Sequence, residues 1–200
     1  MEYNHFEYGE MLAEKLCPII ESKDKKRYYT CSESENLYDF TRRLSSVKDV
    51  VMIALDGCNS DYEMNGADAL LEIPQYFFLF LQTAKTDSPA DILAKQKGCK
   101  RICEQVQAYM LQEMKQPFKT TPLKCLQPDS FTIRGIGPVG DNFYGALLGF
   151  NFKLSTNYQL DSEYWVEKLV DNQGKVITDN NDKNLLGDLK KDKTGNFFKG

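Results

Sequence analysis

Hydrophobic positions recur at helical spacing near the start of the chain and predict an amphipathic helix within the first 20 residues. The repeating positions are Phe6, Gly9, Leu12, Leu16 and Ile19 or Ile20. Pro18 is expected to shorten this helix, because proline removes a backbone donor and clashes with the preceding turn.

A second and longer helix is marked at its start by the sequence Ser88-Pro89-Ala90-Asp91. A serine at the N-cap, a proline at the first helical position and an acid three residues after the cap are typical start signals. Apolar residues then form a single stripe: Ile92, Cys99, Ile102, Cys103, Val106, Tyr109, Met110 and Met114. Pro117 follows the stripe, so we predict one helix over Pro89–Met114 with the stripe buried.

Two apolar runs predict buried strands. Residues 50–55 form a continuous apolar run, and residues 70–83 contain Tyr76-Phe77-Phe78-Leu79-Phe80-Leu81, the strongest strand signal in the chain. The polar residues 56–68 between them are interpreted as a loop. Weaker patterns predict a short strand at residues 27–31 and a short helix at residues 36–47.

The sequence Gly135-Ile136-Gly137-Pro138-Val139-Gly140 matches G-x-G-x-x-G, the fingerprint of a dinucleotide-binding loop. Such a site also needs a helix that begins at the last glycine, because its N-terminus provides N–H groups for the pyrophosphate. Residues 141–154 instead combine aromatic residues, glycines and an alternation typical of a strand. We therefore predict two long strands joined by a glycine-rich loop at residues 135–142 that binds no dinucleotide.

Apolar side chains on or near this loop are candidates for contact with a partner: Ile136, Val139, Phe143 and Tyr144. The alternative is that they fold back onto the chain's own core, as aromatic residues in strands usually do.

The C-terminal part of the chain is polar. Trp165 lies in a segment predicted to be one arm of a hairpin that turns at residues 172–174, and from Thr178 onward Asp, Asn, Lys and Gly dominate. We expect an exposed or disordered tail. Its few apolar residues, which include Leu185, Leu186, Phe197 and Phe198, are expected to anchor on a partner.

This order of elements predicts an α/β (α+β) fold, with a mixed or antiparallel sheet of about four to five strands and helices packed on one face. Residues 1–165 are expected to form the core domain and residues 166–200 a polar C-terminal extension.

Composition narrows the classes of function. The net charge of −4 does not favour nucleic acid or an anionic membrane, and we expect neither a membrane nor a sequence-specific nucleic acid as a partner. The acidic N-terminus lacks the features of a signal peptide, so a reducing cytosol is expected. The six cysteines are therefore interpreted as free thiols.

Candidate catalytic or metal-binding residues are few, and we expect no enzyme activity, cofactor or metal. His5 is the only histidine and is expected to be an inert surface residue. Cys99 and Cys103 lie on the apolar stripe, which favours core packing. Residues 56–61 resemble a fragment of a calcium loop but lack its regular acid spacing, so a turn is expected.

The element order resembles that of the small tail-terminator and tail-completion proteins of tailed bacteriophages. The matching segments are residues 50–55, 76–83 and 130–154 and the helix Pro89–Met114, and the match covers residues 1–160 in element order and texture. The resemblance implies a neck or tail protein of the virion that is assembled in the bacterial cytoplasm. It also implies a ring, commonly of six copies, with tail-tube and portal or connector proteins as partners.

Two other functions remain open from the sequence. The first is a non-viral adaptor or binding module in a bacterial cytosol. The second is a small enzyme whose site lies between residues 56–68 and 135–142.

Overall fold

The computed structural model describes residues 3–19, 27–32, 49–64, 70–116 and 121–156, and the backbone of residues 189–191 and 197–199. The chain forms two compact units, Met1–Asn157 and Tyr158–Gly200. The helix expected at residues 36–47 and the hairpin expected around Trp165 lie outside the described residues.

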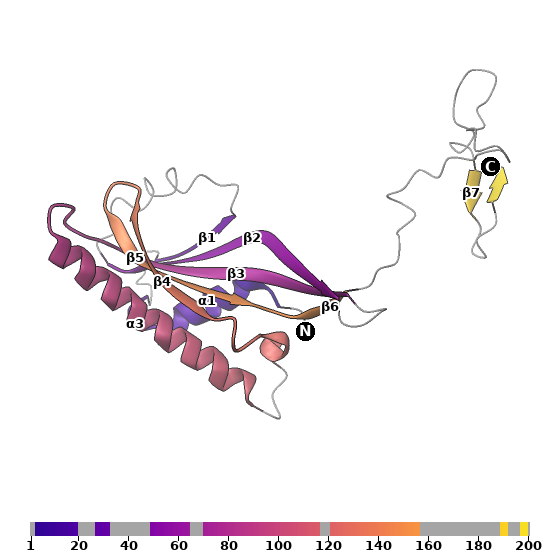
Figure 1. Cartoon of the computed structure of the whole chain (residues 1–200), viewed down its shortest axis with the longest axis horizontal. Coiled ribbons are helices and arrows are strands. Elements are labelled where there is room, and N and C mark those ends of the chain that lie inside the picture. The colour runs from indigo at the N-terminus through magenta and orange to yellow at the C-terminus, as the bar shows by residue number, and fades with distance from the viewer. Residues whose placement is uncertain are drawn as a thin grey trace, which may run out of the picture. The chain divides into compact units, whose positions relative to one another are not determined.

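The first unit is an α+β fold in which helices cover one face of a mixed sheet (Figure 1). Its elements, in chain order, are α1 His5–Lys15, β1 Tyr28–Ser32, β2 Val51–Met64, β3 Leu70–Thr83, α3 Pro89–Met114, the 3-10 turn η1 Pro122–Cys125, β4 Thr132–Val139, β5 Phe143–Asn151 and β6 Leu154–Thr156. The predicted fold class is confirmed, with a sheet of six strands instead of four to five.

Strand order in the sheet is β1-β2-β3-β5-β4. β1 pairs with β2 in parallel, and the other pairs are antiparallel. β6 pairs with Leu70 to Glu72 of β3 in the same register in which β5 pairs with Gln75 to Thr83, so β6 continues the edge that β5 forms along β3. In the second unit, β7 Leu189–Lys191 pairs with β8 Phe197–Lys199 in an antiparallel ladder.

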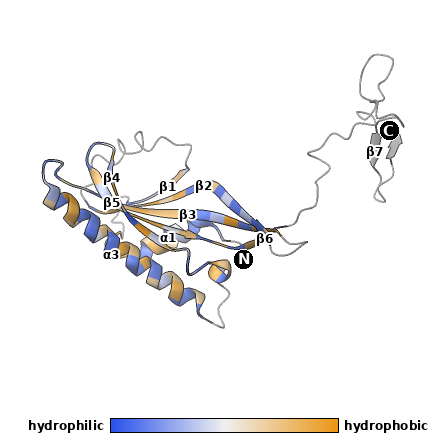
Figure 2. Cartoon of the chain, viewed as in Figure 1, coloured by the Kyte–Doolittle hydropathy of each residue, from blue (hydrophilic) through white to orange (hydrophobic). Residues whose placement is uncertain are grey.

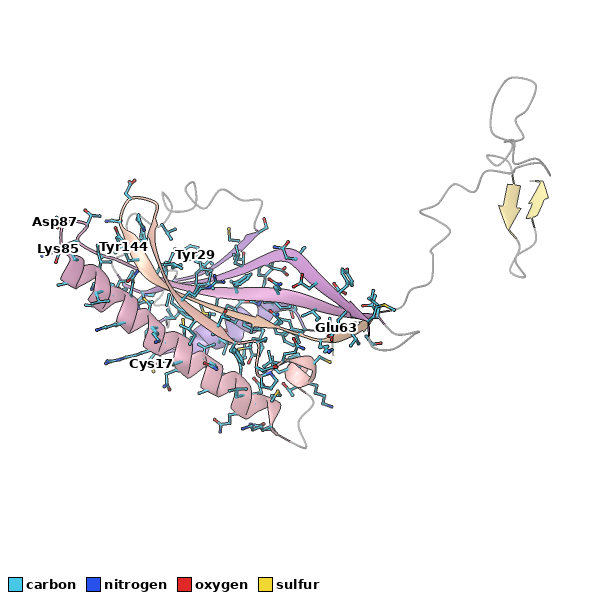
Figure 3. All side chains as sticks on the ribbon, viewed as in Figure 1. Cys17, Tyr29, Glu63, Lys85, Asp87 and Tyr144 are labelled. Carbon is cyan, nitrogen blue, oxygen red and sulfur yellow. The ribbon has the colours of Figure 1, made fainter. Side chains whose placement is uncertain are left out.

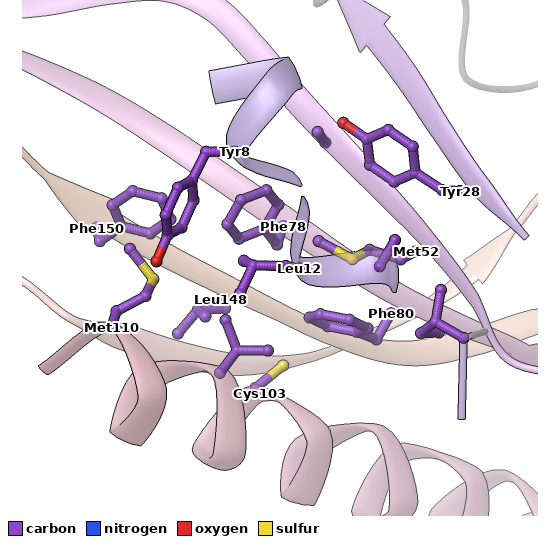
Figure 4. Close-up of a cluster of buried hydrophobic side chains, with 14 of the residues drawn as sticks. Tyr8, Leu12, Tyr28, Met52, Phe78, Phe80, Cys103, Met110, Leu148 and Phe150 are labelled. Carbon is purple, nitrogen blue, oxygen red and sulfur yellow. The ribbon is translucent and has the colours of Figure 1, made fainter. Parts of the chain in front are cut away.

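The main core lies between the sheet and the two helices. Phe78 and Phe80 of β3 and Phe150 of β5 are almost completely buried there, and α3 covers them with the predicted stripe, including Cys103 and Met110 (Figure 4). Each side chain of this size contributes about 1.5–3 kcal/mol when fully buried. The opposite face of the sheet carries a second cluster: Cys31, Val51, Ile53, Leu79, Leu81 and Phe143.

A capping side chain stands at the start of both helices, and the cap of α3 is the predicted Ser88. The side chain of Asn4 accepts hydrogen bonds from the backbone N–H groups of Phe6 and Glu7, and the hydroxyl of Ser88 accepts one from Asp91 N–H at 3.3 Å. These bonds satisfy donors that have no partner inside the helix. The predicted bounds of α3 are confirmed.

The prediction of a loop from residue 56 onward was wrong. β2 continues to Met64 and pairs with β3 from Ser60 opposite Pro74 to Met64 opposite Leu70, after a bulge that includes Cys58 at φ 51°. Figure 2 shows hydrophobic residues before this bulge and mostly hydrophilic ones beyond it. Pairing with β3 supplies the backbone hydrogen bonds, so the polar segment is a strand without a core of its own.

The glycine motif lies in a β-hairpin. Gly135 to Val139 belong to β4, and only residues 140–142 form the turn into β5, so the predicted loop is shorter than expected. Gly137 has φ 131°, a conformation that favours glycine. No helix follows Gly140 in this described segment, as predicted.

We expect Val106→Asp to lower the free energy of unfolding by about 3 kcal/mol or more, because it places a carboxylate in the core. Val106 is fully buried, whereas its neighbour Gln105 is exposed, so Gln105→Asp is the matched control. Denaturant unfolding of both variants tests this, and equal midpoints would contradict burial of the stripe.

Two glycine-to-alanine variants should change stability in opposite directions. At Gly145 a Cβ would collide with the backbone carbonyl of Phe80, so Gly145→Ala should destabilise the protein by at least about 1–3 kcal/mol. At Gly98, inside α3, a Cβ meets nothing within 4 Å, so Gly98→Ala should stabilise it by about 1 kcal/mol. Thermal melts check both, and a stabilised Gly145→Ala would refute the close strand packing.

Candidate functional site

The part of the β2–β3 hairpin beyond the bulge is the first candidate surface, and we call residues 60–64 and 70–74 the arm. Both strands contain 14 residues, and the arm is the end of the pair that lies furthest from the start of α3 (Figure 1). Tyr62 and Met64 are 60% and 58% exposed, and they are among the few large hydrophobic residues exposed in the described chain.

Side-chain hydrogen bonds and an ion pair brace the arm. Ser60 donates to Glu72 at 2.7 Å, Gln75 donates to Asp61 at 2.7 Å, and Lys153 forms an ion pair with Glu63 at 2.7 Å. Exposed pairs of this kind contribute little energy each. Together with the backbone ladder they hold the arm in one register.

The side chains of the arm alternate between the two faces of the sheet. Tyr62 is opposite Glu72 and Met64 is opposite Leu70, so these four residues share a face. Along β3 this is the face of Phe78 and Phe80, which the helices cover further on. The arm therefore presents an apolar patch with one carboxylate on the helix side of the sheet.

A groove between α1 and α3 is the second candidate surface. It has a volume of about 280 Å³ and is lined by Leu12, Lys15, Leu16, Gln105, Val106, Ala108, Tyr109 and Gln112. Leu12 and Val106 are buried and form its floor. At its rim the Lys15 ammonium donates to the Tyr109 hydroxyl at 2.8 Å and lies 5.3 Å from the centre of that ring.

The residues predicted as an interface near the glycine motif are distributed differently from the expectation. Phe143 and Tyr144 are 2% and 8% exposed, so they belong to the chain's own core and not to a partner interface. This agrees with the alternative expectation that these residues fold back onto the core. Ile136 and Val139 are half-buried and pack against the second core cluster. The reason is that these four residues lie in paired strands instead of a long loop.

The predicted anchors in the tail receive no further support. Leu185 and Leu186 lie outside the described residues, and Phe197 and Phe198 belong to β8, of which only the backbone is described. Their contact with a partner stays a prediction.

His5 is a buried residue of α1, so the expectation of a surface residue was wrong. Its ring stacks on Tyr76 and Phe78, and Nε2 lies 3.0 Å from the Phe77 carbonyl oxygen. Because a carbonyl only accepts, Nε2 carries the hydrogen and Nδ1 accepts from the Tyr3 hydroxyl at 3.0 Å. No local pattern indicates this burial, because the strand that covers His5 lies 72 residues further along the chain.

The chemistry around His5 is that of a neutral imidazole. Burial lowers its pKa to about 4, and the bond to the Phe77 carbonyl opposes this only in part. Burial also raises the pKa of the Tyr3 hydroxyl well above its usual value. The imidazole is therefore uncharged near neutral pH and joins α1 to β3.

A second buried polar contact joins α1 to α3. The Tyr8 hydroxyl donates to a carboxylate oxygen of Glu113 at 2.9 Å, and both residues are buried. Burial, followed by this hydrogen bond, raises the pKa of Tyr8. The contact fixes the distance between the two helices near the groove.

The cysteines behave as the sequence predicted. All six lie among the described residues and none is in a disulfide bond, and Cys99 and Cys103 are buried in the stripe of α3. Burial raises the pKa of Cys99 to about 11 and of Cys103 to about 12, so both are protonated thiols at neutral pH.

The two segments suggested as walls of an enzyme site lie at opposite ends of the sheet. Ser60 to Met64 pair with the first residues of β3, whereas Val139 and Phe143 lie at its last residue, Thr83. Figure 3 shows this separation between Glu63 and Tyr144. Nine residues of strand from Pro74 to Thr83 span roughly 30 Å, too far for one small-molecule site.

Residues 56–61 form strand and bulge instead of a calcium loop, and Asp56 accepts a hydrogen bond from Cys58 N–H at 2.9 Å. In the described parts of the chain, no group of three or more His, Cys, Asp or Glu side chains is arranged to bind a metal. None of the described helices has the length and apolar character needed to cross a membrane.

Sequence reasoning missed the residues Tyr62 and Met64. The available signal was the alternation of Asp61, Tyr62, Glu63 and Met64, which is a strand pattern with period two. Gly57, Gly66 and the polar residues around this segment favoured a loop instead.

The stability of the protein should depend on pH through His5. Its pKa is about 6.5 when unfolded and about 4 when folded, so the folded state disfavours the proton. The free energy of unfolding should therefore fall as pH drops from 6.5 to 4, by about 3 kcal/mol in total, and this contribution is fully present above pH 6.5.

Urea unfolding of wild type and His5→Gln between pH 8 and pH 4.5 measures this contribution. Glutamine keeps a donor for the Phe77 carbonyl but does not titrate, so the difference between the two proteins should shrink on acidification. Parallel pH profiles would show that His5 is not the titrating group.

No protein-family model matches the sequence, and a search of curated proteins finds no significant match.

Proposed function

We propose that this chain is a structural protein that assembles with copies of itself into a ring, and that the ring acts in the neck or tail of a tailed bacteriophage. Its partners in that role are the tail-tube and the portal or connector proteins. The observation that carries the proposal is the exposed apolar patch on the arm, where Tyr62 is 60% exposed.

An exposed tyrosine on a paired strand suits a protein interface. Tyrosine is enriched in interfaces, and it brings a large contact area with only two rotatable side-chain angles to fix. The arm is held by its backbone ladder and by the Lys153–Glu63 ion pair, so little chain entropy is lost when a partner covers it.

The position of the arm favours a ring over a symmetric dimer. The arm lies at one end of the sheet. When the arm of one copy contacts a different surface on the next copy, the contact is head to tail. Such contacts close into a ring when the rotation between neighbouring copies permits. Pairing through β4 is less favourable, because Pro138 lacks a backbone donor and the ladder is irregular between Ile136 and Val139.

Light scattering after size-exclusion chromatography, over a range of concentrations, tests the assembly. We expect a discrete oligomer, with six copies as the expected number, and ring-shaped particles by negative-stain electron microscopy. Addition of purified tail tubes or portal complexes should produce rings bound at their ends.

A monomer at every concentration, with or without tail tubes and portal complexes, would overturn this function. An oligomer that binds neither tail tubes nor portal complexes would support self-assembly but contradict the phage role. The chain would then be interpreted as a non-viral scaffold. Deletion of residues 178–200 shows whether the polar tail takes part.

A further inference from the structure

We propose that the arm of one copy docks in the groove between α1 and α3 of the next copy, with Tyr62 as the inserted side chain. This inference rests on the assembly function proposed above.

The size of the groove fits side chains of a partner protein. Its volume of about 280 Å³ is below the 300–1,000 Å³ that is usual for small-molecule sites. Its floor is apolar, with Leu12 and Val106 buried beneath the partly exposed Leu16. One aromatic ring and a neighbouring thioether match both the size and the polarity of this space.

The arm offers those groups on one face. Tyr62 and Met64 point to the helix side of the sheet, two residues apart, in a paired strand. They remain 60% and 58% exposed, so they do not fill the groove of their own chain. Their burial in a second copy removes two exposed apolar groups and fills an apolar groove in a single contact.

Charge complementarity supports the same pairing. Glu72 is directly opposite Tyr62 and shares its face, so it enters the contact beside the inserted ring. Lys15 is the charged residue among those that line the groove, and it lies at the rim beside Tyr109. An ammonium has three donors, so Lys15 can keep its bond to the Tyr109 hydroxyl and also donate to Glu72 of the neighbouring copy.

The contact is head to tail, since each copy contributes an arm to one neighbour and a groove to the other. Such a contact uses different surfaces on the two copies and repeats around a ring. A variant with only one of the two surfaces damaged should therefore still bind a copy through its other surface.

Two variants separate the surfaces. Tyr62→Ser with Met64→Ser removes the inserted groups, and Ala108→Trp fills the groove from an exposed helix position. Each should reduce the oligomer to a monomer by light scattering. Leu93→Ser is the matched control, because Leu93 is also an exposed large hydrophobic residue, at 50%, and should leave the oligomer intact.

Mixing the two variants gives the sharper result. The arm variant retains an intact groove and the groove variant retains an intact arm, so an equimolar mixture should form a 1:1 heterodimer and no ring. Thermal melts of each variant near the wild-type midpoint establish that the monomers are folded.

A cysteine pair places the contact directly. In a background of Cys17→Ser, Cys58→Ser and Cys125→Ser, which removes the exposed thiols, the double variant Glu72→Cys with Lys15→Cys keeps Tyr62 and should form a ladder of disulfide-linked chains on oxidation. A linked dimer from Glu72→Cys alone would show that two arms meet each other and would overturn the proposal.

The outcomes distinguish this inference from the function on which it rests. A monomeric wild-type protein would overturn both the assembly function and the docking of the arm. Wild type that forms rings, together with arm and groove variants that also form rings, keeps the assembly function and overturns the docking of the arm.

Discussion

The structure depends on one strand that has a partner on both edges. β3 pairs with β2 on one side, where a bulge in β2 shifts the register once, and with β5 and β6 on the other side, where both follow one register. Alternation along β3 places Phe78 and Phe80 under the helices and Leu79 and Leu81 on the opposite face. Because both faces are buried in its second half, a slip by one residue would exchange the two cores.

The same pairing explains why the arm exists without a core of its own. The ladder between β2 and β3 resumes after the bulge and continues past the region that the helices cover. Backbone pairing is satisfied there, but neither of the described helices α1 and α3 covers the side chains of Tyr62 and Met64, which remain exposed. A regular sheet that is longer than its helix layer thus produces an apolar patch at a defined place.

Buried polar contacts position the helices that form the groove. His5 ties the start of α1 to the carbonyl of Phe77, and Tyr8 ties α1 to Glu113 near the end of α3. These bonds are directional, so they fix how α1 lies on the aromatic face of the sheet more closely than apolar packing alone. The groove beside Lys15 and Tyr109 is a consequence of that placement.

Elements with local signals could be predicted from the amino-acid sequence. The bounds of α3 follow from the Ser88 cap and the apolar stripe, β3 follows from its aromatic run, and the absence of a helix after Gly140 follows from the residues that come next. The strand at residues 60–64, the burial of His5 and the groove between α1 and α3 depend on contacts between distant segments. The arm requires β3, His5 requires Phe77 and Phe78, and the side chain of Lys15 requires Tyr109, 94 residues further along the chain. A local pattern states which residues prefer to be buried or paired, but the partner that satisfies them is chosen only when the whole sheet forms.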